Sequence, residues 1–319
     1  MYKRFELHNH STESDGSIPT NELVDYMAQN AVDVFAITDH NTISGHKKIE
    51  AYLKEKKYPL ECIYGMEYTT YYGHILYFNL YDYISWENID KNHAERLFAE
   101  LKKAGALVGI AHPFSLGAPL AQGCRWEMDI RDYSCLDFIE IVNNPEPMHG
   151  TNDQGIAWWE SLCLKGMKIA MSAGMDLHNK ADFAGRFAVY IDVQNGESGA
   201  DALKRAIQTQ QTHVTKGPVL ETSLSGNTLH SRITDCVKPG FALESVPFWT
   251  LEHTTISGTR VQKLERGVHE AVLSLSELSN APVIITKLYA GEKKLDNLTA
   301  VALLTAEENS HQRRLARAV

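Results

Sequence analysis

The chain of 319 residues lacks the features that mark a secreted, disulfide-bonded or membrane-spanning protein. Its cysteines are only five, an odd number without a C-x-x-C pair, which argues against a disulfide framework or a thiolate zinc site. We expect reduced, mostly buried thiols. No apolar run approaches membrane-spanning length, and no charged segment is followed by an apolar signal core. We therefore expect a cytoplasmic protein with no membrane partner.

Positive charge is also scarce. Lysine and arginine together number 31 against 40 aspartates and glutamates, which gives a formal net charge of -9. Such a balance disfavours a surface that binds nucleic-acid polymers by neutralising phosphates, although a local metal cluster can still attract one phosphate. With 44% hydrophobic and 22% charged residues, the chain can bury a large core. These values indicate a soluble enzyme that acts on a small substrate.

The first forty residues contain the strongest chemical signal. Two apolar runs, Phe5–Leu7 and Val32–Ile37, each stop abruptly at histidines and carboxylates, as buried strands do when their ends deliver ligands to one point. Residues i and i+2 of an extended strand point to the same side, so the side chains of His8 and His10 can reach one ion together. A polar surface turn would explain one histidine. It explains poorly the set formed by His8, His10, Asp15 and His40.

Short apolar strands alternate with helical segments through about residue 208, a rhythm that predicts parallel strands with crossover helices. Ligands collect at the carboxyl ends of such strands, where Glu67, His112 and the i, i+2 pair Asp176 and His178 also fall. The segment Phe114–Asp132 has no clear periodicity and is expected to be a long functional or mobile loop. After the first two strands, the strands expected are Leu60–Met66, Gly73–Phe78, Leu107–Ala111, Phe138–Val142, Lys168–Ser172 and Phe187–Asp192.

The alternation of strands and helices ends at Thr212. Beyond it, short segments with alternating apolar and polar residues occur without helices between them. This pattern predicts an antiparallel sandwich of the small immunoglobulin-like type. The expected organisation is an α/β domain over residues 1–215, a β-sandwich accessory domain over 216–306 and a charged tail over 307–319. The accessory domain is a candidate for interaction or homo-oligomer formation. Its strands are expected at Val219–Ser223, Trp249–Ser257, Val268–Leu275, Val283–Tyr289 and Leu298–Thr305.

Six short motifs in this order resemble those of the polymerase and histidinol phosphatase (PHP) superfamily. They are His8-Asn9-His10, Ser14-Asp15-Gly16, Thr38-Asp39-His40-Asn41, Gly65-Met66-Glu67, Ala111-His112-Pro113 and Asp176-Leu177-His178. The resemblance covers roughly residues 1–215. The segment Gln211–Pro218 followed by a β-rich tail is similar to the CehA/McbA-type group of two-domain metallohydrolases. The resemblance implies a distorted seven-stranded α/β barrel with two or three divalent metals at the carboxyl ends of its strands.

The resemblance also implies a set of nine ligands. Carried over, His8, His10, Glu67 and Asp176 would hold one ion; Glu67, His74 and His112 a second; and Asp15, His40 and His178 a third. Glu67 would bridge two ions. Where the family often has Gly-Ser-Asp-x-His, this chain has Ala173-Gly174-Met175-Asp176-Leu177-His178, which keeps the ligands but alters their neighbours. Imidazole and carboxylate ligands without thiolates suit Zn, Mn or Fe, and the sequence does not choose between them.

Several residues outside the ligand set have an expected role or position of their own. Arg186 could clamp a phosphate oxygen or form an ordinary salt bridge, and His149 could touch substrate from its turn-rich loop. His46 and His93 fall in helical segments and are expected at the surface. The pair Trp158 and Trp159 is expected to pack in the core.

Three functions remain open. The first is hydrolysis of a small phosphomonoester or nucleotide at a di- or trinuclear metal site by water activated on the metal. The second, suggested by the two-domain resemblance, is hydrolysis of carboxylic or carbamic esters. The third is a non-catalytic domain that binds metal for structure, and the complete ligand set argues against it.

Overall fold

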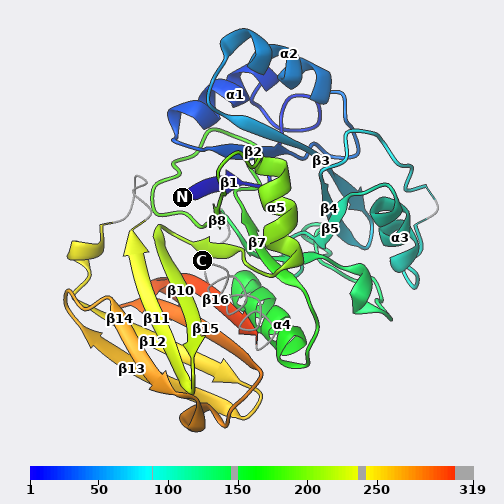
Figure 1. Cartoon of the computed structure of the whole chain (residues 1–319). Helices are drawn as coiled ribbons and strands as arrows, with labels where there is room; N and C mark the ends of the chain where they lie inside the picture. Colours follow the sequence, from blue (N-terminus) through cyan, green and yellow to red (C-terminus); the bar gives the residue numbers. More distant parts are fainter. Residues whose placement is uncertain (88, 145–149, 236–241, 306–319) are drawn as a thin grey trace.

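A computed structural model describes residues 1–87, 89–144, 150–235 and 242–305. Strands and α-helices are interspersed from the N-terminus to residue 208, and strands then follow one another (Figure 1). The first part contains β1 (Tyr2–Glu6), α1 (Thr20–Gln29), β2 (Val34–Ile37), α2 (His46–Lys56), β3 (Glu61–Thr70), β4 (Gly73–Phe78), α3 (Glu95–Lys103), β5 (Leu107–Ile110), β6 (Phe138–Asn143), α4 (Thr151–Leu164), β7 (Ala170–Gly174), β8 (Ala188–Asp192), α5 (Gly199–Gln208) and β9 (His213–Thr215). The fold is therefore mixed α/β with a β-rich C-terminal part.

The seven strands β1 to β7 lie side by side in sequence order. The segments that follow the first and the last of them also meet, because His10 N–H donates to Leu177 O (3.0 Å) and Leu177 N–H donates to His8 O (3.2 Å). These contacts bring the ends of β1 and β7 together. The expected parallel arrangement is wrong at β4, which pairs antiparallel with both β3 and β5 because a tight turn joins β3 to β4. It is also wrong at β8, which pairs antiparallel with β1.

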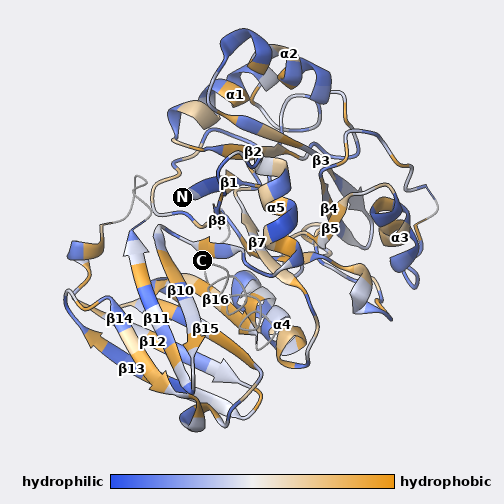
Figure 2. Ribbon diagram, viewed as in Figure 1, coloured by the Kyte–Doolittle hydropathy of each residue, from blue (hydrophilic) through white to orange (hydrophobic). Residues whose placement is uncertain are grey.

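Apolar faces explain where the helices lie. Leu23, Val24 and Met27 of α1 are fully buried and pack with Phe35 and Ile37 of β2. Most of α2 is solvated, and Figure 2 shows it mainly in hydrophilic colours. None of the helices in the described ranges is both long and apolar enough to cross a membrane.

The C-terminal part consists of β10 (Pro218–Ser225), β11 (Thr228–Asp235), β12 (Phe248–Thr255), β13 (Gly258–Glu265), β14 (Glu270–Ser274), β15 (Val283–Ala290) and β16 (Leu298–Thr305). One sheet has the order β10-β11-β14, and the strands β13-β12-β15-β16 continue through β9 into the first part of the chain. A shared apolar core, with Leu220 and Ile233 on one sheet and Trp249 and Leu288 on the other, joins the two layers.

The C-terminal sheet is also packed against α4. Trp159 and Ile156 of that helix lie in the same apolar cluster as Ile285 of β15 and Val301 of β16. Strand β16 is therefore buried on both faces, which accounts for its apolar sequence from Leu298 to Leu304, interrupted only by Thr299. The two parts of the chain thus share a core as well as a sheet.

Candidate metal centre

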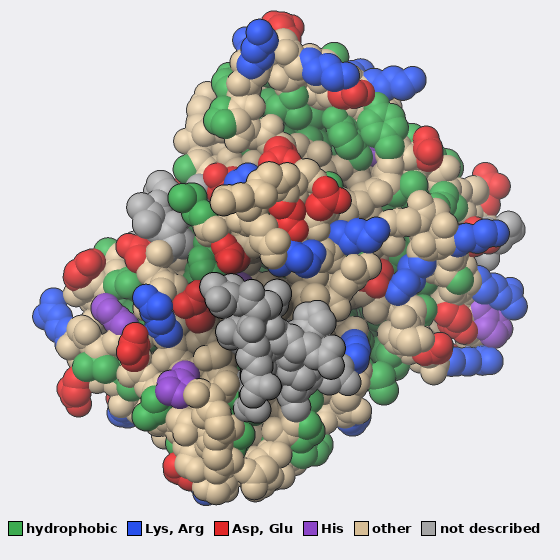
Figure 3. Space-filling model, viewed as in Figure 1, with side chains coloured by type: hydrophobic (Ala, Val, Ile, Leu, Met, Phe, Trp, Pro, Cys, Tyr) green, Lys and Arg blue, Asp and Glu red, His purple; other side chains and the backbone are tan. Residues whose placement is uncertain are grey.

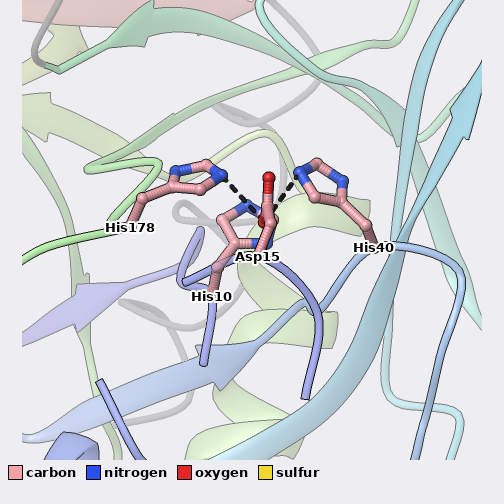
Figure 4. Close-up of side chains that lie close together, drawn as sticks. All are labelled: His10, Asp15, His40 and His178. Atoms are coloured by element: carbon pink, nitrogen blue, oxygen red, sulfur yellow. Dashed lines mark ion pairs between the residues drawn. The ribbon is translucent and has the colours of Figure 1, made fainter. Parts of the chain in front are cut away.

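Nine side chains from different segments converge where the first seven strands end. His8 and His10 follow β1, His40 follows β2, His112 follows β5, and Asp176 and His178 follow β7. Glu67 and His74 come from within β3 and β4, and Asp15 comes from the turn before α1. Figure 4 shows four of these side chains, His10, Asp15, His40 and His178, turned toward one another from the three segments that follow β1, β2 and β7.

The carboxylate of Asp39 holds the turn that carries Asp15 in place. Asp39 accepts hydrogen bonds from Ser11 N–H (2.7 Å), Ser11 Oγ (2.8 Å) and Ser14 Oγ (2.9 Å). The turn closes tightly, because a Cβ on Gly16 would lie 2.7 Å from the carbonyl carbon of His10. Glycine is therefore needed after Asp15 for His10 and Asp15 to belong to one group.

Glu67 is the centre of the cluster and is completely buried. Its Oε2 lies 3.1 Å from His8 Nε2, 3.3 Å from His10 Nε2 and 3.0 Å from His40 Nδ1. Its Oε1 lies 2.9 Å from His74 Nδ1 and 3.1 Å from His112 Nε2. Five imidazoles thus surround one carboxylate.

Two further carboxylates complete the cluster. Asp176 Oδ1 lies 3.0 Å from His10 Nε2 and 3.4 Å from His8 Nε2. Asp15 Oδ1 lies 3.2 Å from His178 Nε2 and 3.5 Å from His40 Nε2. The backbone of Asp176 (φ 47°) is in the left-handed region, which costs on the order of 1–3 kcal/mol and is typical of functional sites.

The electrostatics follow from burial and crowding. Burial alone would raise the pKa of Glu67, but His8, His74 and the other imidazoles hold that pKa well below its usual range. Burial would lower the pKa of His8, whereas Glu67, Asp176 and Glu140 raise it well above the usual value. For His10, burial prevails and the pKa is lowered. The pKa values of the neighbouring imidazoles of His8 and His10 are thus shifted in opposite directions.

The donor set fits divalent cations. His8 Nε2 and Glu67 Oε2 are buried and make no hydrogen bond, although they lie only 3.1 Å apart. Unpaired buried polar atoms are costly, and a cation would satisfy both. Three groups place their ligand atoms within 4.8 Å of one another: His8, His10, Glu67 and Asp176; His40, Glu67 and His74; and His10, Asp15, His40 and His178.

These groups largely agree with the sets implied by the resemblance. The first is identical, the second contains His40 where His112 was expected, and the third also includes His10. His112 still belongs to the cluster through its contact with Glu67. The assignment of individual ligands to individual ions remains a prediction.

A cavity of about 530 Å³ opens onto the cluster. It is lined by ligand side chains, by the loop after β7, which contributes Lys180 and Arg186, and by the long loop after β5, which contributes Ser115 and Leu116. Arg186 is exposed and lines this cavity. His149 lies outside the described residues.

Sequence reasoning missed residues behind the ligands. Glu140, on β6, is 1% exposed and lies 3.0 Å from His8 Nδ1. Asn143, at the end of the same strand, donates to Asp176 Oδ2 (3.2 Å). The available signal was a carboxylate inside the otherwise apolar run Phe138–Val142, which a buried strand does not tolerate without a partner.

Two expectations about other side chains are wrong, and a third holds. His46 is 1% exposed rather than at the surface, because its ring nitrogens face the carbonyl oxygens of Gly65 (2.9 Å) and Tyr81 (3.1 Å). Of the four described cysteines, only Cys163 is buried. Trp159 is fully buried, as expected of core packing.

Comparison with known proteins identifies the first part of the chain. Residues 6–122 match the PHP domain family. The chain carries a PHP domain. The matched range includes seven of the nine converging side chains, and the structure brings Asp176 and His178 to them from beyond it.

A solved structure resembles nearly the whole chain. It is a two-domain protein from Bacteroides vulgatus, described as containing a predicted PHP-like metal-dependent phosphoesterase, with a TM-score of 0.58 and 16% sequence identity over 95% of each chain. At this identity the likeness shows the fold. An amidohydrolase from Chromobacterium violaceum, solved with sulfate and no metal, matches 65% of this chain and 96% of its own at 15% identity, but its TM-score of 0.42 is too low to establish a shared fold.

A curated relative matches a shorter segment. A 5'-3' exoribonuclease from Haemophilus influenzae is 41% identical over 70 residues, which make up 22% of this chain and 25% of the relative. The matching segment therefore spans about a quarter of that relative's length.

Proposed function

We propose that this chain is a metal-dependent hydrolase of small phosphoesters, such as a phosphomonoester or nucleotide. The observation that carries the proposal is Glu67, a fully buried carboxylate with five imidazole nitrogens within 3.3 Å and an oxygen that makes no hydrogen bond. Two or three divalent ions, Zn, Mn or Fe, would satisfy this set. The nine converging side chains would hold them.

Bound divalent ions supply an activated water at neutral pH and stabilise the charge on a phosphoryl group during its transfer. The protein's own residues would bind and orient the substrate. Arg186 and Lys180 lie in the cavity wall and offer positive charge to phosphate oxygens, the guanidinium in a fork that matches two of them. Lys180 also pairs with Glu22 (3.1 Å), but both side chains are exposed, so the pair is weak and exchangeable.

The cavity supports a small substrate. Its volume of about 530 Å³ lies within the usual range of small-molecule sites, roughly 300–1,000 Å³. On the face shown in Figure 3, positive and negative side chains are interspersed rather than gathered into one basic patch. A nucleic-acid polymer normally requires such a patch. The similarity to an exoribonuclease supports phosphoester chemistry, and the charge distribution supports a short substrate.

A second candidate is hydrolysis of carboxylic or carbamic esters. Leu116 lines the same cavity and is 56% exposed, which would suit the apolar part of a neutral ester. Three ligand groups around one pocket favour the phosphate instead, because several cations suit a dianion better than a carbonyl.

The architecture is proposed with the function. Residues 1–215 would form the catalytic unit as a distorted seven-stranded barrel, and residues 216–306 an immunoglobulin-like accessory domain that serves interaction, homo-oligomer formation or shielding of the site. The resemblance to the CehA/McbA-type group and a cytoplasmic location belong to the same proposal.

One experiment separates the two reactions. On a single metal-loaded preparation, kcat/KM is compared for aryl phosphates, nucleoside monophosphates and aryl carboxyl esters, for the wild type and for His40→Ala. We expect a phosphate substrate to be fastest and His40→Ala to remove its turnover. If an ester has a higher kcat/KM than every phosphate substrate, and His40→Ala also removes its turnover, ester hydrolysis would become the favoured function.

A further inference from the structure

Glu140 is a buried carboxylate whose neighbours are all hydrogen-bond donors. It lies on β6, between the cluster and the core, and is 1% exposed. Its Oε2 accepts from His112 N–H (2.9 Å) and Asn143 Nδ2 (3.3 Å), and its Oε1 lies 3.0 Å from His8 Nδ1. Within the described ranges, no lysine or arginine forms an ion pair with it. Its charge is therefore compensated by hydrogen bonds directed from the cluster.

These partners determine which nitrogen of His8 carries a proton. A backbone N–H and a side-chain amide N–H can only donate, so Oε2 of Glu140 must accept. An ionised carboxylate accepts at both oxygens, and Nδ1 of His8 must then donate to Oε1. In the neutral ring the other nitrogen, Nε2, then carries the lone pair, and it faces Glu67 Oε2 (3.1 Å) and Asp176 Oδ1 (3.4 Å) without a hydrogen bond.

We infer that Glu140 is a positioning residue that fixes the tautomer of His8 and thereby keeps the site poised for a divalent cation. The inference rests on the proposed role of His8 as a metal ligand. Without Glu140, His8 could move its proton to Nε2 and donate to Glu67, which would satisfy both groups without an ion. Glu140 blocks this alternative in the neutral ring and leaves Nε2 available to a cation.

The carboxylate of Glu140 links the segments that follow β1, β5 and β7. Through the backbone N–H of His112 it fixes the start of the loop after β5, and through Asn143, which also donates to Asp176 Oδ2 (3.2 Å), it is linked to the loop after β7. Residue 174 must be glycine for this arrangement, because a Cβ there would lie 2.7 Å from Glu140 Oε1 and 2.3 Å from His8 Cβ. The backbone of β7 thus makes room for the contact between Glu140 and His8.

Glu140→Gln tests the inference with almost no change of shape. The two obligate donors at Oε2 require the amide oxygen on that side, so the amide NH₂ faces His8 Nδ1 and His8 must take the tautomer with a proton on Nε2. We expect divalent-metal affinity, measured by competition with a chromophoric chelator, to fall about 10- to 100-fold. In nitrogen-15 NMR of histidine-labelled protein without metal, at a pH at which His8 is neutral, one imidazole should show its tautomer reversed.

Glu6→Gln is the matched control. Glu6 is also a fully buried glutamate and lies on β1, two residues before His8, but its hydrogen bonds are to Arg4. This variant should lose stability through Arg4 yet keep wild-type metal affinity and tautomers.

The outcomes distinguish this inference from the proposed function. A Glu140→Gln protein with wild-type metal affinity, or with His8 still protonated on Nδ1, would overturn the role given to Glu140. A wild type that binds no divalent metal would instead overturn the proposed function, while the NMR comparison of metal-free proteins would still decide whether Glu140 sets the tautomer.

Discussion

Gly174→Ala is expected to damage the metal site through one added methyl group. Gly174 ends β7, and a Cβ there would lie 2.3 Å from the Cβ of His8 and 3.2 Å from its backbone nitrogen. Ordinary contacts of a Cβ begin near 3.4 Å, so His8 would have to move by about 1 Å. Metal sites tolerate changes of roughly 0.2 Å in ligand distances. We therefore expect at least a tenfold loss of metal affinity, together with about 1–3 kcal/mol of overpacking.

The assay pairs chelator competition for metal affinity with thermal unfolding of the metal-free protein. Gly155→Ala is the control, because Gly155 lies inside α4 and its added Cβ would be 3.4 Å from Ile141 O, an ordinary contact. That variant should keep its metal affinity and gain up to about 1 kcal/mol of helix stability. A Gly174→Ala protein that binds metal and unfolds like the wild type would refute the close packing of β7 against His8.

Two further predictions concern stability away from the metal centre. Lys287→Met should lower the free energy of unfolding by about 3–5 kcal/mol, because the largely buried ammonium lies 2.8 Å from Glu160 of α4 and 2.9 Å from Glu252 of β12. Burial raises the pKa of Glu160, so the loss measured by denaturant unfolding should be larger at pH 8 than at pH 5, and equal losses at the two pH values would contradict this. Burial lowers the pKa of His253, so the unfolded state takes up its proton first and the free energy of unfolding falls as the pH drops below about 6.5. His253→Gln should remove up to about 1.4 kcal/mol of that fall between pH 7.5 and 5.5, and an unchanged pH dependence in this variant would contradict the prediction.

The ligands themselves could be predicted because local rules govern them. Apolar runs that stop at histidines marked the ends of β1, β2 and β5, and the i, i+2 spacing placed His8 beside His10 and Asp176 beside His178. These signals need only the alternation of a strand and the convergence of strand ends. The alternation of strands and helices likewise predicted the α/β part.

The residues that support the ligands could not be found in the same way, because their partners are distant in sequence. The contact between Glu140 and His8 joins positions 132 residues apart, and burial of His46 depends on carbonyl oxygens of Gly65 and Tyr81. Strands β11 and β13 were also missed. Strand β13 is mostly exposed, so its sequence has no apolar face to reveal it.

The continuity between the two parts of the chain was equally hidden. Strand β9 is only three residues long, yet it pairs with β8 on one side and β16 on the other. The end of the strand–helix alternation at Thr212 predicts a domain boundary there. The shared sheet and the packing of α4 on β15 depend on tertiary contacts that no local sequence pattern encodes.

Metal content and metal dependence test the central claim most directly. Purified protein is loaded with Zn, Mn or Fe, bound ions are counted by elemental analysis, and turnover of an aryl phosphate is measured before chelation, after exhaustive chelation and after metal is restored. We predict two to three ions per chain, loss of turnover on chelation, recovery with metal, and no turnover in His10→Ala. Full activity after exhaustive chelation, or a wild type that retains no divalent ion, would contradict the account.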